Sequence, residues 1–319
     1  MNSQSRHRGA VLAAAIGDAM GHPTEFLSVQ GIRAQYGPRG VQGFELYWER
    51  GGKRFAPYTD DTQMAEIVLR FLLDARDAGL GLDDTMQRMA GGFIDWARSP
   101  QGGHRAPGNA CLAGTRALAS GVPWREAGGA TAGGCGSVMR AYPFGLLYAD
   151  DLERAEAWAV EHSKLTHRDP IALAACAAMA AGVGACVQGA DVKSTLESMV
   201  AAAGRHDGKS AEMIAEAVTE ATRGSGPDRV LDRLRGWAAH EAIAAGAYVF
   251  ARHPDDPRDA ILEGANTPGD SDSIATIAGA LVGARCGADA LPPEWVRDVE
   301  RAAELTELAD RIASARRNP

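Results

Sequence analysis

Hydrophobic residues recur every three or four positions along most of the chain, whereas the strict alternation typical of β-strands is nearly absent. Met64, Ile67 and Phe71, for example, would share one face of a helix. We predict helices over seven ranges with this spacing, which are 63–78, 82–97, 171–187, 210–222, 230–250, 274–285 and 296–315, and a further Ala-rich helix over 10–16. The pattern therefore predicts an all-α protein.

Two segments, 31–58 and 102–108, lack this spacing and are rich in glycine, proline and aromatic residues. We predict that both are long loops, which in compact domains often serve function. No repeat with a period of 20–50 residues and no linker-like stretch divides the chain. The expected architecture is a compact single domain over residues 1–319, a many-helix bundle with a functional cleft at one end.

The composition is ordinary for a soluble globular protein, with 45% hydrophobic and 23% charged residues among 319. A net charge of −8 makes direct nucleic-acid binding and anionic-membrane binding unexpected, because such proteins usually carry a basic face. No stretch reaches the roughly 20 apolar residues that a membrane span needs. These features favour a protein with no membrane association.

Two further observations indicate a cytoplasmic location. The basic N-terminus and the apolar run 10–16 weakly imitate a signal peptide, but Asp18 interrupts the run and no convincing cleavage site follows. The five cysteines are odd in number and form no C-x-x-C pair. We interpret them as buried side chains or thiols in a reducing compartment.

Two acidic clusters, Thr59-Asp60-Asp61-Thr62 and Asp270-Ser271-Asp272-Ser273, each precede a predicted helix. One aspartate or serine at a helix start is explained as an N-cap. Four consecutive polar residues of this kind, occurring twice, exceed what capping needs. Carboxylates brought together by folding repel one another unless cations lie between them. Oxygen donors of this kind favour Mg²⁺ or Mn²⁺, so the sequence indicates a metal-dependent hydrolase.

Other metal sites fit the sequence poorly. An EF-hand loop that begins at Asp270 would need a carboxylate at its twelfth position, which is Leu281. Zinc is poorly supported because no pair of histidines or cysteines has ligand spacing.

Several single residues gain a role only beside the acidic clusters. Glu25 follows the Ala-rich helix and would there position or deprotonate a water molecule. The glycine-rich segment 133–140 lets backbone amides approach a phosphate, although such loops are common. His167 precedes the predicted helix 171–187 and is otherwise explained as a solvated histidine. We interpret Asp95 as a solvent-exposed residue on an amphipathic helix and do not assign it to the site.

These motifs, in this order, resemble the ADP-ribosylglycohydrolase family, of the dinitrogenase-reductase-activating type. The matching segments are 9–26, 59–64, 134–140, 166–167, 269–275, 279–287 and 290–295. The resemblance implies a compact all-α fold with two Mg²⁺ (or Mn²⁺) ions in a cleft. It also implies cleavage of the glycosidic bond between ADP-ribose and a modified acceptor, in an ADP-ribosylated protein or a small ADP-ribose conjugate.

The resemblance also implies roles for individual residues. The implied metal ligands are Thr59, Asp60, Asp61, Asp270, Asp272 and Ser273. Glu25, Asp60 and Asp272 would carry the catalysis. The implied substrate-binding residues are Gly134, Cys135, Gly136, Ser137 and His167.

The chain departs from the family pattern at three positions. Ser271 and Ser273 stand where threonine is usual, and Cys135 replaces a common asparagine or glycine. None of these changes removes a charge, so we expect an active enzyme. We expect ADP-ribosyl-arginine as substrate. The alternatives are serine-linked, nucleic-acid-linked or polymeric ADP-ribose, a non-catalytic ADP-ribose-binding or immunity protein, and another metal-dependent hydrolase such as a phosphatase.

Overall fold

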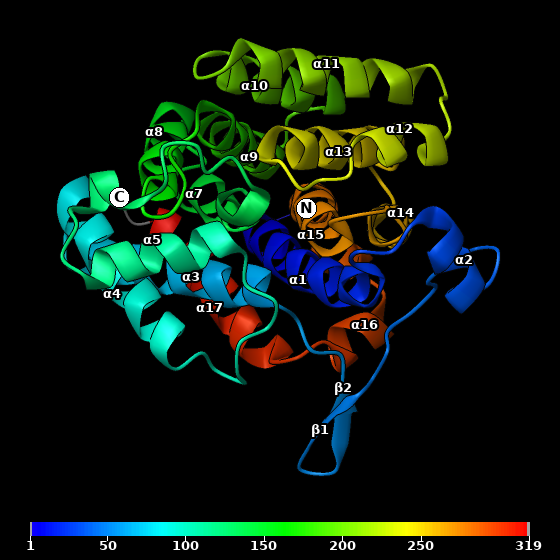
Figure 1. The fold of residues 1–319 in the computed structure, drawn as a ribbon, viewed down its shortest axis with the longest axis horizontal. Coiled ribbons are helices and arrows are strands. Elements are labelled where there is room, and N and C mark those ends of the chain that lie inside the picture. Colours follow the sequence, from blue (N-terminus) through cyan, green and yellow to red (C-terminus); the bar gives the residue numbers. More distant parts are fainter. Residues whose placement is uncertain (1, 318–319) are drawn as a thin grey trace.

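The computed structural model describes residues 2–317, and helices make up most of it (Figure 1). The α-helices are α1 (Ser3–Gly21), α2 (Val29–Tyr36), α3 (Asp60–Asp77), α4 (Leu82–Arg98), α5 (Asn109–Ala119), α6 (Trp124–Ala127), α7 (Tyr142–Leu147), α8 (Leu152–Ser163), α9 (Pro170–Gln188), α10 (Val192–Gly204), α11 (Gly208–Thr222), α12 (Pro227–Arg233), α13 (Ala239–Arg252), α14 (Pro257–Ala265), α15 (Ser271–Cys286), α16 (Pro293–Asp298) and α17 (Ala302–Arg317). Short 3₁₀ turns lie at His22–Thr24, Cys135–Ser137 and Ala288–Ala290. Strands β1 (Trp48–Arg50) and β2 (Lys53–Phe55) form an antiparallel hairpin. The predicted all-α class is confirmed.

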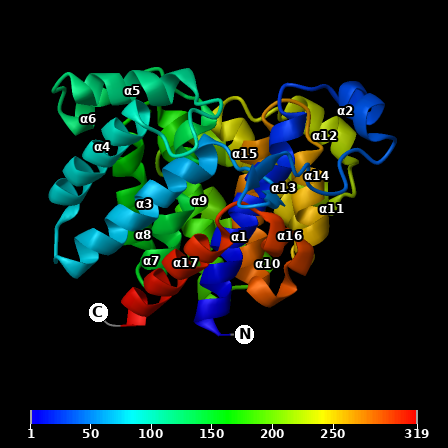
Figure 2. The same cartoon turned by 90° about the horizontal axis from the view of Figure 1, so that it is seen from below.

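Helices α1 and α15 pack side by side at the centre of the molecule, as Figures 1 and 2 show. Glycines allow their backbones to touch. A Cβ atom placed on Gly17 would lie 2.2 Å from the carbonyl oxygen of Ala275, and one on Gly9 would lie 2.2 Å from that of Gly283. No side chain larger than hydrogen fits at these positions, so the sequence brings the two helices into direct backbone contact.

Helix α9 is a second central element, and α7, α8, α10 and α13 pack against it. Among the described residues it is the single helix long and apolar enough to cross a membrane, but 83% of its apolar window is buried inside the protein. Such burial is expected of a core helix that other helices surround. Helices α10 and α11 form an outer layer over α9 and α13 (Figure 1).

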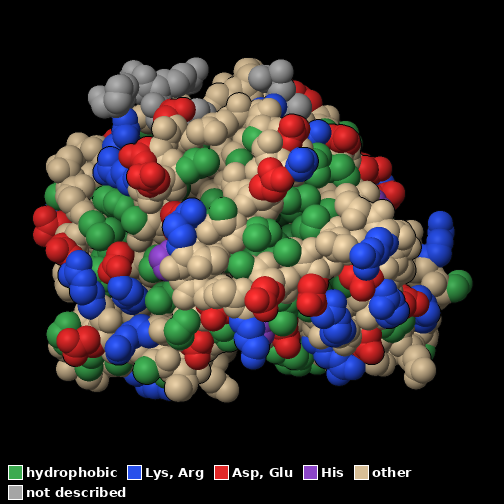
Figure 3. Space-filling view, turned by 90° about the horizontal axis from the view of Figure 1, so that it is seen from above, with side chains coloured by type: hydrophobic (Ala, Val, Ile, Leu, Met, Phe, Trp, Pro, Cys, Tyr) green, Lys and Arg blue, Asp and Glu red, His purple; other side chains and the backbone are tan. Residues whose placement is uncertain are grey.

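Charged side chains of both signs are interspersed on the face drawn in Figure 3. The coloured side chains on that face form no broad basic patch. This distribution agrees with the net charge of −8.

Five predicted helices correspond to α3, α4, α9, α11 and α15, with ends that differ by a few residues, and the Ala-rich helix extends to both sides as α1. Two predictions of a single helix were wrong. The range 230–250 divides into α12 and α13, because the backbone turns at Gly236 with φ of 81°. The range 296–315 divides into α16 and α17 next to Arg301, whose φ is 52°. Both conformations are incompatible with a continuous right-handed helix.

The predicted loop 31–58 was also partly wrong, because it contains most of α2 and the β1–β2 hairpin. The hairpin is short, and its turn uses Gly51 and Gly52, both at positive φ. Segment 102–108 has neither helix nor strand, as predicted.

Candidate active site

The two acidic clusters, which lie far apart in the sequence, meet where α3 and α15 begin. Thr59 is the N-cap of α3, and its side chain accepts a hydrogen bond from the amide of Asp61. The Ser273 hydroxyl donates to Asp61 Oδ2 at 2.9 Å, across 212 positions of sequence. Asp60, Asp61, Asp270 and Asp272 are each only 4–5% exposed. Folding therefore gathers the six predicted ligand residues at one place.

Asp18 is a further acid in this region, and the sequence reasoning gave it no role. It is fully buried on α1, and its carboxylate accepts from the Thr59 amide at 2.9 Å and from the Thr62 amide and hydroxyl at 3.0 and 2.6 Å. Asp18 thus caps α3 from another helix and fixes the position of Asp60 and Asp61. An aspartate within an otherwise apolar Ala-rich stretch was the sequence signal that could have revealed it.

Electrostatics make this cluster unfavourable without a counter-charge. Burial raises the pKa of Asp60, Asp61 and Asp272 well above the usual range, and repulsion from neighbouring carboxylates adds to the effect. Burial also raises the pKa of Asp270 to about 6, although hydrogen bonds from Cys135 and Ser273 oppose the change. The donor set is dominated by carboxylate and hydroxyl oxygens, which suits hard divalent cations. The residues present therefore fit the expected metal ions.

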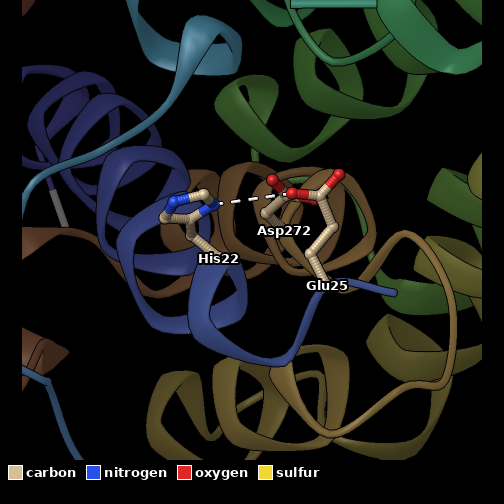
Figure 4. A group of neighbouring side chains, drawn as sticks. All are labelled: His22, Glu25 and Asp272. Atoms are coloured by element: carbon tan, nitrogen blue, oxygen red, sulfur yellow. Dashed lines mark ion pairs between the residues drawn. The ribbon is translucent and has the colours of Figure 1, made fainter. Parts of the chain in front are cut away.

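Glu25 enters the cluster from the end of α1. It follows the 3₁₀ turn His22–Thr24, and its side chain is 9% exposed. Figure 4 shows Glu25, His22 and Asp272 turned toward one another, and one ligand atom from each lies within 4.8 Å of the other two. The next residue, Phe26, has φ of 67° and donates its amide to the Gly269 carbonyl at 2.9 Å. This strained link holds the Glu25 segment against the start of α15.

The predicted substrate loop lies beside the acids. Gly134 forms an antiparallel bridge with Ala238, and Cys135 Sγ donates to Asp270 Oδ2 at 2.6 Å. A Cβ atom placed on Gly136 would lie 3.1 Å from the His167 ring, so Gly136 and His167 are neighbours. The Ser137 hydroxyl, in contrast, is fully buried and accepts from Ser163 at 2.9 Å. Gly134, Cys135, Gly136 and His167 are thus brought together, whereas the Ser137 hydroxyl is engaged within the core.

A buried arginine organises this loop. Arg140 donates to the Gly136 carbonyl at 2.8 Å and to Thr166 Oγ1 at 2.6 Å, and Thr166 Oγ1 lies 2.7 Å from His167 Nδ1. Because the Thr166 oxygen already accepts from Arg140, we assign its proton to the bond with Nδ1, which leaves the His167 proton on Nε2. Burial and the Arg140 charge lower the pKa of His167 to about 3, so the ring is neutral. His167 is therefore a neutral donor beside Gly134 and Gly136.

Two exposed aromatic residues, which the sequence reasoning also missed, lie at the rim of the site. Phe26 and Trp237 are 70% and 42% exposed, and their rings stack with centroids 5.0 Å apart. Phe26 adjoins Glu25, and Trp237 adjoins Ala238 in its bridge with Gly134. The stack therefore links the Glu25 segment to the glycine-rich loop.

Segment 102–108 supports the other side of the site. The Asp60 amide donates to the Arg105 carbonyl at 3.3 Å. The buried Arg105 guanidinium pairs with Glu300 at 2.5 Å and lies 4.1 Å from the centre of the Trp48 ring. The exposed Asp95 lines a cavity of about 460 Å³ with Gln63 and Trp96.

Comparisons with known proteins identify the family of the chain. The chain is 29% identical over 325 residues to ADP-ribosylarginine hydrolase Tri1 of Pseudomonas putida, covering 96% of this chain and 77% of the relative. It is 26% identical over 306 residues to the ADP-ribosyl-[dinitrogen reductase] glycohydrolase of Rhodospirillum rubrum, covering 94% and 92%. A solved structure titled ADP-ribosylglycohydrolase-related protein complex has the same fold, with a TM-score of 0.71, 24% identity, and coverage of 98% and 99%. The ADP-ribosylglycohydrolase profile matches residues 1–319, and the chain therefore belongs to the ADP-ribosylglycohydrolase family.

Proposed function

We propose that this protein, which by its family is a hydrolase of ADP-ribosyl glycosidic bonds, acts on ADP-ribosyl-arginine in a protein or a small conjugate. The arginine acceptor is supported by the relative from Pseudomonas putida, whose name gives ADP-ribosylarginine as substrate. A protein conjugate is supported by the relative from Rhodospirillum rubrum, whose name gives ADP-ribosyl-[dinitrogen reductase]. The observation that carries the proposal is the junction of the two acidic clusters through Ser273 and Asp61.

The same junction supports a dinuclear metal centre. Thr59, Asp60, Asp61, Asp270, Asp272 and Ser273 would hold two Mg²⁺ or Mn²⁺ ions. Such ions, when bound, act as Lewis acids that increase the acidity of water and neutralise nearby negative charge. They would also relieve the repulsion that raises the pKa of the buried aspartates.

The protein's own side chains supply the remaining steps. Glycoside hydrolysis passes through an oxocarbenium-like transition state, which nearby carboxylates stabilise. Glu25 accepts the proton of the attacking water as the new C–O bond forms and the glycosidic C–N bond breaks, and the departing arginine guanidine takes up that proton. Asp60 and Asp272 stabilise the positive charge that develops on the reacting sugar. On the other side, the neutral His167 donates from Nε2, and the backbone amides near Gly134 and Gly136 bind ligand oxygens. The glycine-rich loop is thereby assigned to the ADP-ribose half of the substrate.

A panel of conjugates tests this proposal. Arginine-, serine- and guanine-linked ADP-ribose are incubated with the enzyme in Mg²⁺, in Mn²⁺ and in chelator, and free ADP-ribose is measured. We expect release from the arginine conjugate and its loss in chelator. Asp60→Ala and Asp272→Asn should reduce turnover to background, since each removes an anionic ligand.

The exposed Asp95 offers a matched control, because Asp95→Asn removes the same charge outside the site. It should retain wild-type turnover. Undiminished hydrolysis in chelator, or in either aspartate variant, contradicts the metal-dependent mechanism. Release of phosphate instead of ADP-ribose contradicts the assigned reaction.

A further inference from the structure

His22 places an imidazole among the acids of the site, at a position that no sequence motif singled out. It lies in the 3₁₀ turn that follows α1, three residues before Glu25. Its Nδ1 atom is 3.5 Å from Glu25 Oε2, and the ligand atoms of His22, Glu25 and Asp272 all lie within 4.8 Å of one another (Figure 4). The three residues come from the end of α1 and the start of α15.

The Nδ1 atom has no hydrogen-bond partner although it is buried, while the ring as a whole is 31% exposed. A buried polar atom without a hydrogen-bond partner is unfavourable. The separation of 3.5 Å from Glu25 Oε2 is too long for a charge-assisted hydrogen bond, which is about 2.7–2.9 Å. Nδ1 therefore makes an ion pair with Glu25 when the ring is protonated but no hydrogen bond, and a cation can take the place of the proton between the two groups.

A shared cation explains this separation. Nitrogen and oxygen ligands lie about 2.0–2.2 Å from a first-row divalent ion, so two of them at angles between 90° and 115° are about 3.0–3.6 Å apart. The observed 3.5 Å falls in that range. Asp272 supplies the third donor. Its backbone packs directly against Gly21, the residue before His22, because a Cβ atom on Gly21 would lie 2.6 Å from the Asp272 Cα.

We propose that His22 is a metal ligand through Nδ1 and shares a divalent transition-metal ion with Glu25 and Asp272. This inference rests on the proposed function for the position of the ion at one end of the acidic cluster. A nitrogen donor favours first-row transition ions over Mg²⁺, which prefers oxygen ligands and retains its water molecules, and this preference grows from Mn²⁺ to Co²⁺. His22 thus makes the centre of this chain selective for transition metals.

The test uses metal-freed full-length protein loaded with Mn²⁺, and electron spin-echo spectroscopy to detect a nitrogen nucleus bound directly to the ion. We expect a histidine ¹⁴N signal in the wild type and its loss in His22→Gln. Calorimetry should show that His22→Gln weakens Co²⁺ and Mn²⁺ binding about tenfold or more, as expected when a ligand contact is lost, with Mg²⁺ affinity unchanged. His206→Gln is the matched control, because it removes an imidazole outside the site. His206 lies between α10 and α11 and pairs with Glu156 of α8. It should behave as the wild type.

The wild-type spectrum alone decides whether His22 can be a ligand, so the test does not depend on the folding of a variant. A Mn²⁺-loaded wild type without a ¹⁴N signal overturns the proposal, as does a His22→Gln variant that retains the signal. These readouts need no substrate. A ¹⁴N signal in a protein that cleaves no ADP-ribose conjugate would refute the proposed function and leave the ligand assignment standing, and intact hydrolysis without the signal would do the reverse.

Discussion

Asp270 is a buried acid of the site whose ionisation depends on folding. Burial raises its pKa from 3.8 to about 6, so the folded protein binds the Asp270 proton more tightly than the unfolded chain does. In metal-free protein the stabilisation from this proton is fully present below pH 3.8 and is lost as the pH rises through about 6. Bound cations would reverse this trend, because they require the ionised carboxylate.

Asp270→Asn should remove this pH dependence. In chelator, the free energy of unfolding of the variant should improve relative to wild type by about 3 kcal/mol between pH 4 and pH 7.5, the equivalent of the two-unit difference in pKa. Urea unfolding at the two pH values measures the difference between the variant and the wild type. A stability difference that is constant with pH would refute the account of Asp270.

Thr166 controls the tautomer of His167. Its oxygen accepts from Arg140 at 2.6 Å and lies 2.7 Å from Nδ1, so the hydroxyl is the one group between a fixed cation and the ring. Thr166→Val removes the hydroxyl that keeps Nδ1 unprotonated, so the fraction of rings that carry the proton on Nε2 should fall. We expect ADP-ribose affinity to fall about tenfold, which corresponds to one neutral hydrogen bond of about 1.4 kcal/mol.

Nitrogen NMR of the imidazole identifies the tautomer, and calorimetry measures ADP-ribose affinity. Thr166→Ser keeps the hydroxyl and should restore both. If Thr166→Val binds ADP-ribose normally, or if its ring keeps the Nε2 proton, then Arg140 and Thr166 do not position His167.

The contact between α1 and α15 joins the helix that leads to Glu25 and the helix that begins with the second acidic cluster. Asp18 and His22 lie on or just after α1, and Asp272 lies in the first turn of α15. Because the backbones touch at Gly17, any displacement of one helix is transmitted to the other.

Gly17→Ala should therefore destabilise the protein by about 1–3 kcal/mol or more, as overpacking in a close-packed core does. The added Cβ would lie 2.2 Å from the Ala275 carbonyl oxygen and force α15 away from α1. Gly91→Ala in α4 is the control, because its Cβ meets no atom within 4 Å. It should stabilise by about 0.5–1 kcal/mol through helix propensity. Urea unfolding compares the two, and equal effects would contradict this view of the interface.

Long-range ties through Arg105 hold the outer parts of the molecule to the site. The Arg105 guanidinium pairs with Glu300, 195 positions away, and stacks on Trp48 of the hairpin. The backbone carbonyl of Arg105 accepts a hydrogen bond from the Asp60 amide. Loop, hairpin and C-terminal segment thus meet behind the first acidic cluster.

Glu300→Ala would leave the buried Arg105 charge without its partner. We expect a loss of about 3–5 kcal/mol in the free energy of unfolding, the usual effect of breaking a buried ion pair from one side. Glu304→Ala, which breaks an exposed contact with Arg301, should cost less than about 1 kcal/mol. Denaturant unfolding measures both, and a loss at Glu300 as small as that at Glu304 would show that the buried pair adds little.

The sequence predicted the parts of this molecule that local patterns determine. Periodic apolar positions located α3 and α4, and the chemistry of unpaired carboxylates predicted that the two acidic clusters would meet. Local patterns did not reveal the turn at Gly236, because the residues around it keep helical spacing. They also did not reveal Asp18 or His22, whose partners depend on how α1 packs against α3 and α15.

The backbone contact of α1 with α15 also has a consequence for biosynthesis. The Ser271 hydroxyl donates to the Gly21 carbonyl across 250 positions, so α1 is synthesised long before α15, its packing partner. Until α15 has been synthesised, Gly9 and Gly17 of α1 lack the helix against which they pack. The carboxylates of Asp270 and Asp272 are then also still missing. A nascent chain that lacks α15 therefore has an incomplete acidic cluster and no activity, and a pairing between segments so distant in sequence is expected to form slowly.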